Sequence, residues 1–552
     1  MLADDTLLNI FRHYLEVIPR DWPTLAWVCR AWRQIIFTSP LSLNLRLYCT
    51  YRTPVLKTLH CWPDLPIIVQ YGGRPNLGPP APEDDDNIIA ALTQSGRVSS
   101  IGLTVSCSLL EKLSAISEPF SELEELALMF RDNTPLTLPS TIRWGPRLRT
   151  LHLTRIAFPS FLQLLSPCHG LVDLQLHEIP SAGYFSPEAF TNALSGMTQL
   201  EMLSLHFLSL PPRRNYLGLP PHSWERVLLP SLTCLKYRGT SKYLDSLVAR
   251  VDAPRLGYID LTFFSQPTMD ASQLGRFIER IELQRSFSQA DVQTSADAIS
   301  ISFTNSSIPT ALRLQIPCKQ LDWQLSSMSQ ILNQFSHFLF RVENLGIDST
   351  EPPSEQDDEG GEQWPELIRE FGSAKDFRLS GVYVTDILCA LRPADEGHPT
   401  DTTVLPSLRN LRVKDPFPTV GRLWDAAQLF ITSRRLSGRP VRLDTVLIYQ
   451  CHICDASFTQ QQEYKRHLGD KHAEFRLCSY CGDYGFTPEH SHLFPEHLSS
   501  KHPEVVRNDA LSSDSFLAPT DSQLVILIFQ HSSLLASDIV SPSSTVTARY
   551  SR

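Results

Sequence analysis

The chain has 552 residues, of which 42% are apolar, so it is too long for one hydrophobic core and should fold as several units. Its net charge of −10 argues against a nucleic-acid surface covering the whole protein. No basic start precedes an apolar run, and the late apolar stretch Leu524–Phe529 is too short to span a bilayer. We therefore expect a protein of the cytoplasm, the nucleus or both.

Cysteine usage agrees with a reducing compartment. Of the twelve cysteines, four form two Cys-x-x-Cys pairs near the end of the chain. Scattered cysteines in a protein without a secretory signal are most simply buried free thiols. We expect this of the other eight, which are Cys29, Cys49, Cys61, Cys107, Cys168, Cys234, Cys318 and Cys389.

The first 40 residues predict two short amphipathic helices. After possible N-cap residues at Asp4, Asp5 and Thr6, apolar residues recur at helical spacing up to Leu15. A second apolar series follows Trp22-Pro23 and ends near Ile36. Two such helices cannot bury their apolar faces alone, so they either cap a larger domain or dock a partner.

The order of these residues resembles an F-box, a motif that binds the Skp-type adaptor of cullin–RING ubiquitin ligases. The matching residues are Leu2, Asp4, Leu7, Leu8, Ile10, Phe11, Val28, Cys29, Trp32 and Arg33. Ala3 stands where the family usually has proline. The resemblance implies a substrate receptor that does no catalysis itself. It also implies that the adaptor is bound by Leu2, Leu7, Leu8, Ile10, Phe11, Val28, Cys29 and Trp32. The stretch from Phe37 to Ile67 resembles the entry of fungal-type F-box proteins into a leucine-rich domain.

The middle of the chain repeats the pattern Leu-x-x-Leu-x-Leu with some substitutions. The copies start at Leu123, Leu148, Leu171, Leu200, Leu232 and Leu256, so they are 23 to 32 residues apart, and a late copy starts at Leu408. This period is typical of a leucine-rich repeat, in which each copy supplies one short strand with the leucines facing inward. Side chains between the leucines should then be exposed, and examples are Glu124, Arg149, Thr150, Asp173, Glu201 and Lys236.

The pattern weakens after Phe264, although Ser300–Phe303 and Leu312–Ile316 alternate as strands would. Leu345 and Ile347 read as another inward-facing pair. We predict loops at two acidic stretches, Pro79–Asp86 and Ser349–Gln363, and the second holds six acidic residues and no basic one. A helix over Leu423–Leu436, closed by Gly438, and a last strand over Val441–Ile448 should complete the repeat region.

Two metal sites are predicted after the last strand. Cys451, Cys454, His467 and His472 have ligand types and spacings suited to tetrahedral Zn²⁺, with Phe458 and Tyr464 as core positions. They resemble a two-Cys, two-His zinc finger. A degenerate second copy has Cys478, Cys481, His497 and His502, with His490 and His492 as spare ligands. We expect one zinc ion in the first finger and a second in the degenerate one.

The finger positions that would face DNA in that family are Gln460, Glu463 and Arg466. However, residues 451–502 hold five Lys or Arg and seven Asp or Glu, a net charge of −2. Phosphate contacts supply much of DNA affinity, so we favour a protein-binding or stabilising finger over one that reads DNA.

These patterns predict an α/β protein with an N-terminal F-box over residues 1–45 and an irregular leucine-rich-repeat solenoid over 46–448. Zinc fingers follow over 449–475 and 476–504, and a Ser-rich tail runs over 505–552. The predicted function is that of the substrate-recognition subunit of a cullin–RING ligase, binding an Skp-type adaptor and an unidentified target. The alternatives are a zinc-finger nuclear regulator and a leucine-rich interaction protein without a ligase role. No phosphate-binding loop, dinucleotide turn or nucleophile elbow points to an enzyme.

Overall fold

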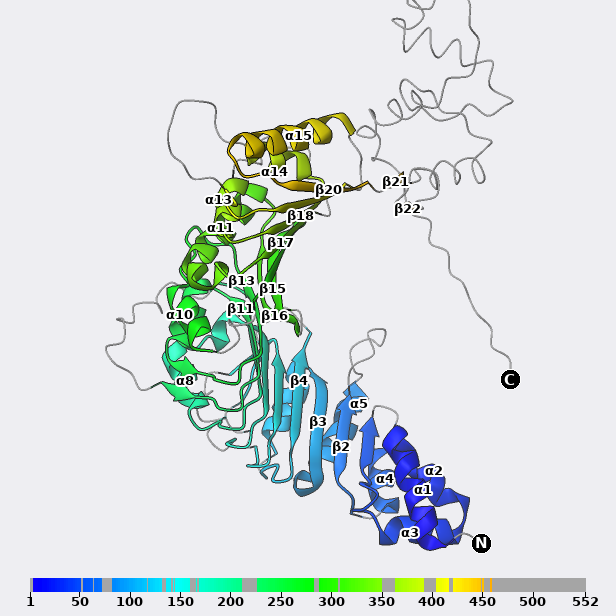
Figure 1. Ribbon diagram of the computed structural model, residues 1–552. Coiled ribbons are helices and arrows are strands. Elements are labelled where there is room, and N and C mark those ends of the chain that lie inside the picture. Colours follow the sequence, from blue (N-terminus) through cyan, green and yellow to red (C-terminus); the bar gives the residue numbers. More distant parts are fainter. Residues whose placement is uncertain are drawn as a thin grey trace, which may run out of the picture. The chain divides into compact units, whose positions relative to one another are not determined.

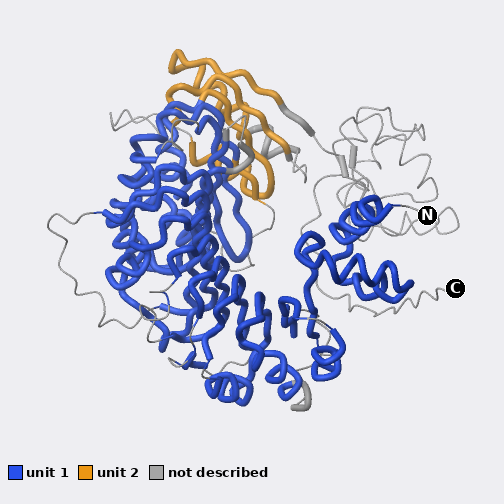
Figure 2. The backbone as a smooth tube through the Cα atoms, turned by 90° about the horizontal axis from the view of Figure 1, so that it is seen from below, with its two compact units in different colours: residues 1–346, 353–374 blue, residues 347–352, 375–552 orange. Residues whose placement is uncertain are grey.

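The computed structural model describes 3–50, 53–62, 64–71, 82–116, 118–131, 136–139, 142, 144–158, 165, 168–210, 226–281, 287–305, 308–349, 363–391, 404–415, 420–447, 449–450 and 457–458. The chain divides into two compact units (Figure 2). The first is Met1–Gly346 with Pro353–Ala374, and the second is Ile347–Pro352 with Lys375–Arg552.

The first unit begins with a helical cluster, by which we mean α1 (Asp4–Val17), η1 (Pro19–Asp21), α2 (Trp22–Val28) and α3 (Arg30–Thr38). The second predicted helix is therefore two helices. The break falls at Cys29, whose backbone is extended and whose Sγ accepts the Trp32 N–H at 3.5 Å, so Cys29 serves as the N-cap of α3.

Aromatic side chains hold the helical cluster together and join it to the strands. Phe11 is 1% exposed, and its ring lies 4.8 Å from that of Trp32 in an edge-to-face arrangement. Trp22 is also buried, and its indole N–H donates to the carbonyl of Arg46 at 2.7 Å. The Trp22 ring packs 4.9 Å from that of Trp62, which directly follows α4 (Val55–Cys61).

A long sheet fills most of the first unit (Figure 1). Its strands, in spatial order, are β1 (Leu47–Thr50), β2 (Ile67–Tyr71), β3 (Val98–Val105), β4 (Glu125–Phe130), β6 (Thr150–Thr154), β8 (Asp173–Ile179), β9 (Met202–Phe207), β11 (Cys234–Gly239), β13 (Tyr258–Phe263), β16 (Ile308–Pro317), β15 (Ala298–Asn305) and β14 (Gln289–Thr294). Neighbouring strands are parallel from β1 to β16.

The leucine copies explain this order. The six copies between Leu123 and Leu261 become β4, β6, β8, β9, β11 and β13, paired so that Leu126, Leu151, Leu174, Leu203, Leu235 and Ile259 share one row. All members of that row are buried. The predicted strands are thus confirmed, and each copy buries its leucines against those of its neighbours.

Helices cover the leucine side of the sheet (Figure 1). Tyr243 of one such helix packs its ring 4.9 Å from Phe207 of β9. The remaining helices of this unit are α5 (Pro82–Leu92), η2 (Ser95–Arg97), α6 (Cys107–Ser114), η3 (Ser181–Gly183), α8 (Pro187–Leu194), α9 (Ser241–Val248), α10 (Ser272–Arg280), α11 (Leu321–Leu332), η6 (Asn333–Phe335), α12 (Ser336–Leu339) and α13 (Trp364–Arg369). Two small parallel pairs join β5 (Leu136–Thr137) to β7 (Ile156–Ala157) and β10 (Val227–Leu228) to β12 (Val251–Asp252).

Three expectations are corrected or sharpened. The acidic stretch predicted as a loop over Pro79–Asp86 instead enters α5 at Pro82, because proline suits the first turn of a helix and carboxylates there favour its dipole. The weak region after Phe264 holds an antiparallel insertion in which β15 pairs with both β14 and β16. The acidic residues 351–362 lie outside the described residues.

The scattered cysteines are all free thiols, but the expectation that they are buried fails for most of them. Only Cys49 and Cys168 are buried, and burial raises the pKa of each thiol to about 11. The exposed cysteines are Cys29, Cys61, Cys107 and Cys389. The thiol of Cys29 accepts a hydrogen bond as the N-cap of α3.

The second unit has three parallel strands, β18 (Asp376–Gly381), β19 (Asn410–Asp415) and β20 (Arg442–Leu447), with helices α14 (Val384–Ala390) and α15 (Val420–Leu436). The late leucine copy is β19, and the predicted last helix and strand are α15 and β20. Strand β17 (Asn344–Ser349), which contains the predicted pair Leu345 and Ile347, runs from the first unit into the second. The antiparallel pair β21 (Tyr449–Gln450) and β22 (Ser457–Phe458) follows β20.

Candidate protein-recognition surface

The face of the sheet opposite the leucines carries polar side chains, and we call it the strand face. Because side chains alternate along a strand, the residue between two buried leucines points to this face. One row of the strand face, in register from β6 to β16, is His152, Gln175, Ser204, Lys236, Asp260 and Arg313. Of the residues predicted to be exposed between the leucines, Arg149 and Glu201 are exposed, whereas others are half-buried, namely Glu124, Thr150, Asp173 and Lys236.

Histidines from three strands take part in two separate hydrogen-bonded sets on the strand face. The Nε2 of His152 lies 2.9 Å from a carboxylate oxygen of Asp173, which also accepts from the Gln175 amide at 3.0 Å. Farther along, the Nε2 of His177 lies 2.8 Å from the hydroxyl of Ser204. The polar atoms on this part of the face are thus engaged with one another across β6, β8 and β9.

His177 and His206 stack on each other, with ring centroids 4.4 Å apart and an angle of 11° between the planes. The Ser204 hydroxyl lies between them, 3.4 Å from the His206 Nε2. Burial lowers the pKa of His177, helped by the nearby charges of His152 and Lys236. Burial, the neighbouring His177 and Arg238 lower the pKa of His206 to about 4. Both rings are therefore neutral at pH 7.

A bulge at the end of β8 lies next to this histidine pair. The pairing of β8 with β9 shifts register between Leu176 and Ile179. Within that shift Glu178 has a φ of 50°, and Arg155, directly after β6, has a φ of 61°, both in the left-handed region. The two side chains form an ion pair, which holds the bulge from the exposed side.

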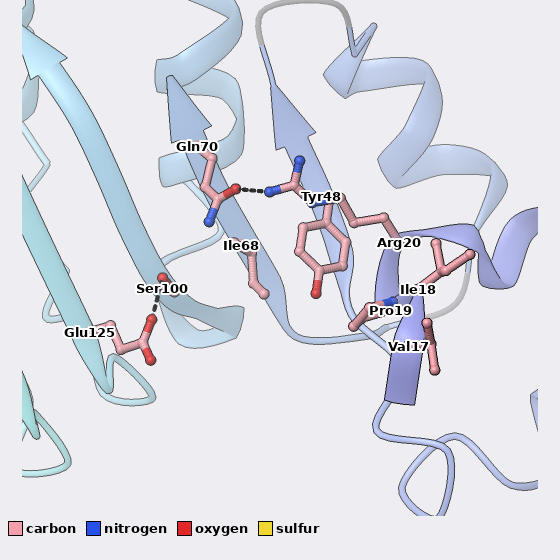
Figure 3. Close-up of a pocket in the computed structure, with 9 residues that line it drawn as sticks. All are labelled: Val17, Ile18, Pro19, Arg20, Tyr48, Ile68, Gln70, Ser100 and Glu125. Atoms are coloured by element: carbon pink, nitrogen blue, oxygen red, sulfur yellow. Dashed lines mark hydrogen bonds between the residues drawn. The ribbon is translucent and has the colours of Figure 1, made fainter. Parts of the chain in front are cut away.

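A pocket of about 330 Å³ lies where the helical cluster meets the first strands (Figure 3). Val17, Ile18, Pro19 and Arg20 from the end of α1 and η1 line one side, and Tyr48, Ile68, Gln70, Ser100 and Glu125 from β1 to β4 line the other. The Arg20 guanidinium donates to the Gln70 amide oxygen and lies 5.1 Å from the Tyr48 ring centre. Ser100 donates to Glu125 at 3.0 Å. The pocket therefore offers apolar walls with a cation and a carboxylate on its rim.

The residues predicted to bind an adaptor fall into two groups. Val28 is 57% exposed and Ile10 is 49% exposed, while Leu7 and Leu8 are half-buried. The other three stabilise the helical cluster itself. Phe11 is buried, Trp32 packs its ring on Phe11, and Cys29 caps α3. Leu2 lies outside the described residues. A partner that binds the helical cluster would meet the first group and depend on the second only through folding.

The predicted zinc ligands Cys451, Cys454, His467, His472, Cys478, Cys481, His497 and His502 lie outside the described residues, as do Gln460, Glu463 and Arg466. Within the described part of the chain, no cluster of His, Cys, Asp or Glu is arranged to hold a metal ion. Nor does any helix in that part have the length and apolar character needed to cross a membrane.

The sequence patterns above did not predict the strand-face histidines His152, His177 and His206, although the sequence contains a signal for them. Each histidine directly follows a repeat leucine, in Leu151-His152, Leu176-His177 and Leu205-His206. Aligning the intervening residues of successive copies, rather than the leucines alone, would have placed the three on neighbouring strands.

Comparison with known proteins adds little to this description. No family model matches the chain, and no curated protein matches it. Among solved structures, the chain is similar to the leucine-rich repeat-containing protein LegL7 from Legionella pneumophila. The match covers 72% of this chain and 98% of LegL7, with 12% sequence identity and a TM-score of 0.24. The assignment of a leucine-rich strand stack rests on the register and burial given above.

Proposed function

We propose that the protein is a target-recognition subunit that docks an Skp-type adaptor of a cullin–RING ubiquitin ligase through the helical cluster and binds its target on the strand face. The observation that carries this proposal is the exposure of Ile10 and Val28 in a cluster whose own core is complete without them. Exposed apolar side chains on a small helical cluster suit a partner interface. The ligase partner would perform ubiquitin transfer.

The strand face supports the second half of the proposal. It is a broad polar surface backed by a continuous leucine core, so its side chains can vary without disturbing the fold. The pocket of Figure 3 lies at the junction of the helical cluster and the strand face. A target bound there would lie next to the docked adaptor.

The finger region extends the proposal. The strands β21 and β22 pair antiparallel on either side of Cys451 and Cys454, which supports a ββα finger with its first two ligands in the connecting turn. We propose that Cys451, Cys454, His467 and His472 hold one zinc ion, and that Cys478, Cys481, His497 and His502 hold a second. Bound zinc would fix the fold of each finger.

Adaptor docking is tested by co-purifying the full chain with an Skp-type adaptor. The Ile10→Asp, Val28→Asp double variant should reduce capture more than tenfold, because it places charge on an apolar contact surface while leaving the buried residues unchanged. Phe11 is avoided, since altering a buried ring would unfold the helical cluster.

The matched control is Leu56→Asp on α4, which also changes an exposed apolar residue, 72% exposed, outside the F-box-like residues. It should capture the adaptor as well as the wild type does. Equal capture by the double variant and the wild type, with unchanged circular dichroism, would refute docking through these residues. No capture by the intact chain would leave a leucine-rich interaction protein.

A further inference from the structure

The middle of the strand face carries cations without partners. Lys236 and Arg238 lie on β11 and Arg313 lies on β16, and we call these three residues the cationic block. Within the described part of the chain, none of their side chains makes an ion pair or a hydrogen bond. Lys236 is half-buried, and Arg238 and Arg313 are exposed.

The positive charge of these strands is local and opposite in sign to the net charge of the protein. Strands β9, β11, β13 and β16 contain three Lys or Arg (Lys236, Arg238 and Arg313) and one carboxylate (Asp260), so their formal charge is +2 in a chain of net charge −10. Asp260 accepts a hydrogen bond from Tyr258 at 3.3 Å and makes no ion pair among the described residues. The cationic block is therefore not a by-product of a basic chain.

Asp260 lies in register between Lys236 and Arg313 and offsets one of the three charges, and the carboxylates of β8 are bonded to other side chains. Asp173 is bound by His152 and Gln175, and Glu178 is paired with Arg155. Next to Arg238 in register lies His206, which is neutral at pH 7 because its pKa is lowered to about 4, in part by Arg238 and Lys236. Burial is the main cause of that lowered pKa, and the charges of Arg238 and Lys236 add to it.

From this arrangement we infer that the cationic block binds an acidic segment of the target protein, with carboxylates of that segment pairing with Lys236, Arg238 and Arg313. This inference rests on the proposed function and names the partner chemistry of the strand face. Charge complementarity of this kind selects the partner and speeds its encounter. Three cations make few of the phosphate contacts on which nucleic-acid affinity depends, so the observations favour an acidic peptide.

The register suggests the spacing of the acidic residues. Lys236 and Arg313 are separated by one strand, β13, so their Cα atoms are roughly 10 Å apart at the usual interstrand spacing. An extended peptide that crosses the strands advances about 3.3 Å per residue, so acidic residues three positions apart would meet the two cations.

The test is fluorescence anisotropy with the full chain and a fluorescein-labelled peptide of serines in which Glu recurs at every third position. The wild type should bind this peptide, and should bind a peptide with Gln in place of Glu at least fivefold more weakly. The Lys236→Gln, Arg238→Gln, Arg313→Gln variant should lose at least fivefold in affinity for the Glu peptide.

The matched control removes the same charge elsewhere, in the Arg255→Gln, Arg276→Gln, Lys319→Gln variant. These three residues are exposed and lie in the turn before β13, on α10 and in the turn before α11. The control should bind as the wild type does. Equal losses in both variants would mean that net charge alone drives binding and would overturn the inference, as would a failure of the wild type to bind.

A 12-nucleotide single strand of DNA is the competing probe. If it binds more tightly than the Glu peptide and is released by the same three substitutions, the cationic block is a nucleic-acid contact and the inference is wrong. Adaptor capture measured on the same preparations separates the two proposals. A protein that captures the adaptor and ignores the peptide refutes only the acidic-segment inference, and the reverse result refutes only adaptor docking.

Discussion

At the scale of single residues, the paired histidines of the strand face share one hydroxyl. The Ser204 Oγ lies 2.8 Å from the His177 Nε2 and 3.4 Å from the His206 Nε2, so it can donate to one ring and accept from the other. That arrangement requires at least one neutral ring. Protonation of both rings would remove the acceptor and bring two like charges into a stacked pair 4.4 Å apart.

Acid should therefore weaken the fold through His206. Its pKa in the folded protein, about 4, is below the value of about 6.5 expected in the unfolded chain. Above pH 6.5 neither state binds the proton, so stability is unaffected. Between pH 6.5 and 4 the unfolded state binds the proton and the folded state does not, so the free energy of unfolding falls as the pH is lowered. Below pH 4 both states bind the proton, so this contribution falls no further.

The measurement is the urea midpoint at pH 7.5 and at pH 4.5. His206→Gln should lose less stability between the two than the wild type does, because glutamine keeps a polar group and does not titrate. His60→Gln, at an exposed position on α4, should behave as the wild type. The same acid loss in His206→Gln and the wild type would show that this ring does not limit acid stability.

At the scale of elements, one glycine decides how β18 ends. Gly381 has a φ of 97°, in a region that only glycine adopts easily, and a Cβ there would overlap the carbonyl oxygen of Ser349. Ser349 is itself held by its hydroxyl, which donates to the Ser380 carbonyl at 3.3 Å and accepts from the Tyr383 N–H at 3.2 Å. The backbone at Gly381 therefore has little freedom to move.

Gly381→Ala should destabilise the second unit by about 2 kcal/mol or more, since it adds left-handed strain to a backbone overlap. Gly438→Ala is the matched control. Gly438 has a φ of 73° but no atom within 4 Å of the added Cβ, so only the strain of about 1 kcal/mol should remain. Urea unfolding of both variants checks the difference, and equal losses would mean that the Ser349 contact relaxes freely.

Local interactions also explain why two helices differ from those predicted from the sequence. Cys29 divides the second predicted helix because its extended backbone lets the thiol cap α3, and periodicity alone does not register such a break. At Pro82 the same acidic composition that suggests a loop also suits the first turn of a helix. The choice depends on whether the following residues can be buried, and Ile88, Ala91 and Leu92 of α5 are fully buried.

At the scale of the whole molecule, metal content tests the part of the chain that follows β20. The purified full chain should contain about two zinc ions per molecule, measured by plasma mass spectrometry, because each predicted ligand set holds one ion. Cys451→Ser and Cys478→Ser should each lower the content by about one. Cys389→Ser, which removes an exposed thiol on α14, should leave it unchanged. A zinc-free wild type would contradict the finger assignment.

The sequence by itself determined the repeat strands and their order. The last two leucines of each copy alternate along a strand and so face one side, and stacking successive copies covers each leucine row, as Leu126, Leu151 and Leu174 show. It also predicted that the side chains between the leucines are exposed, and Arg149 and Glu201 are exposed while Asp173 and Lys236 are half-buried. Aligned copies place His152, His177 and His206 on neighbouring strands, and the tertiary structure decided which polar atoms bond to each other. His177 bonds the hydroxyl of Ser204, while Asp173 and Glu178 are bonded to His152 and Arg155 rather than to the cationic block. Those choices are made between strands, and no spacing along one strand records them.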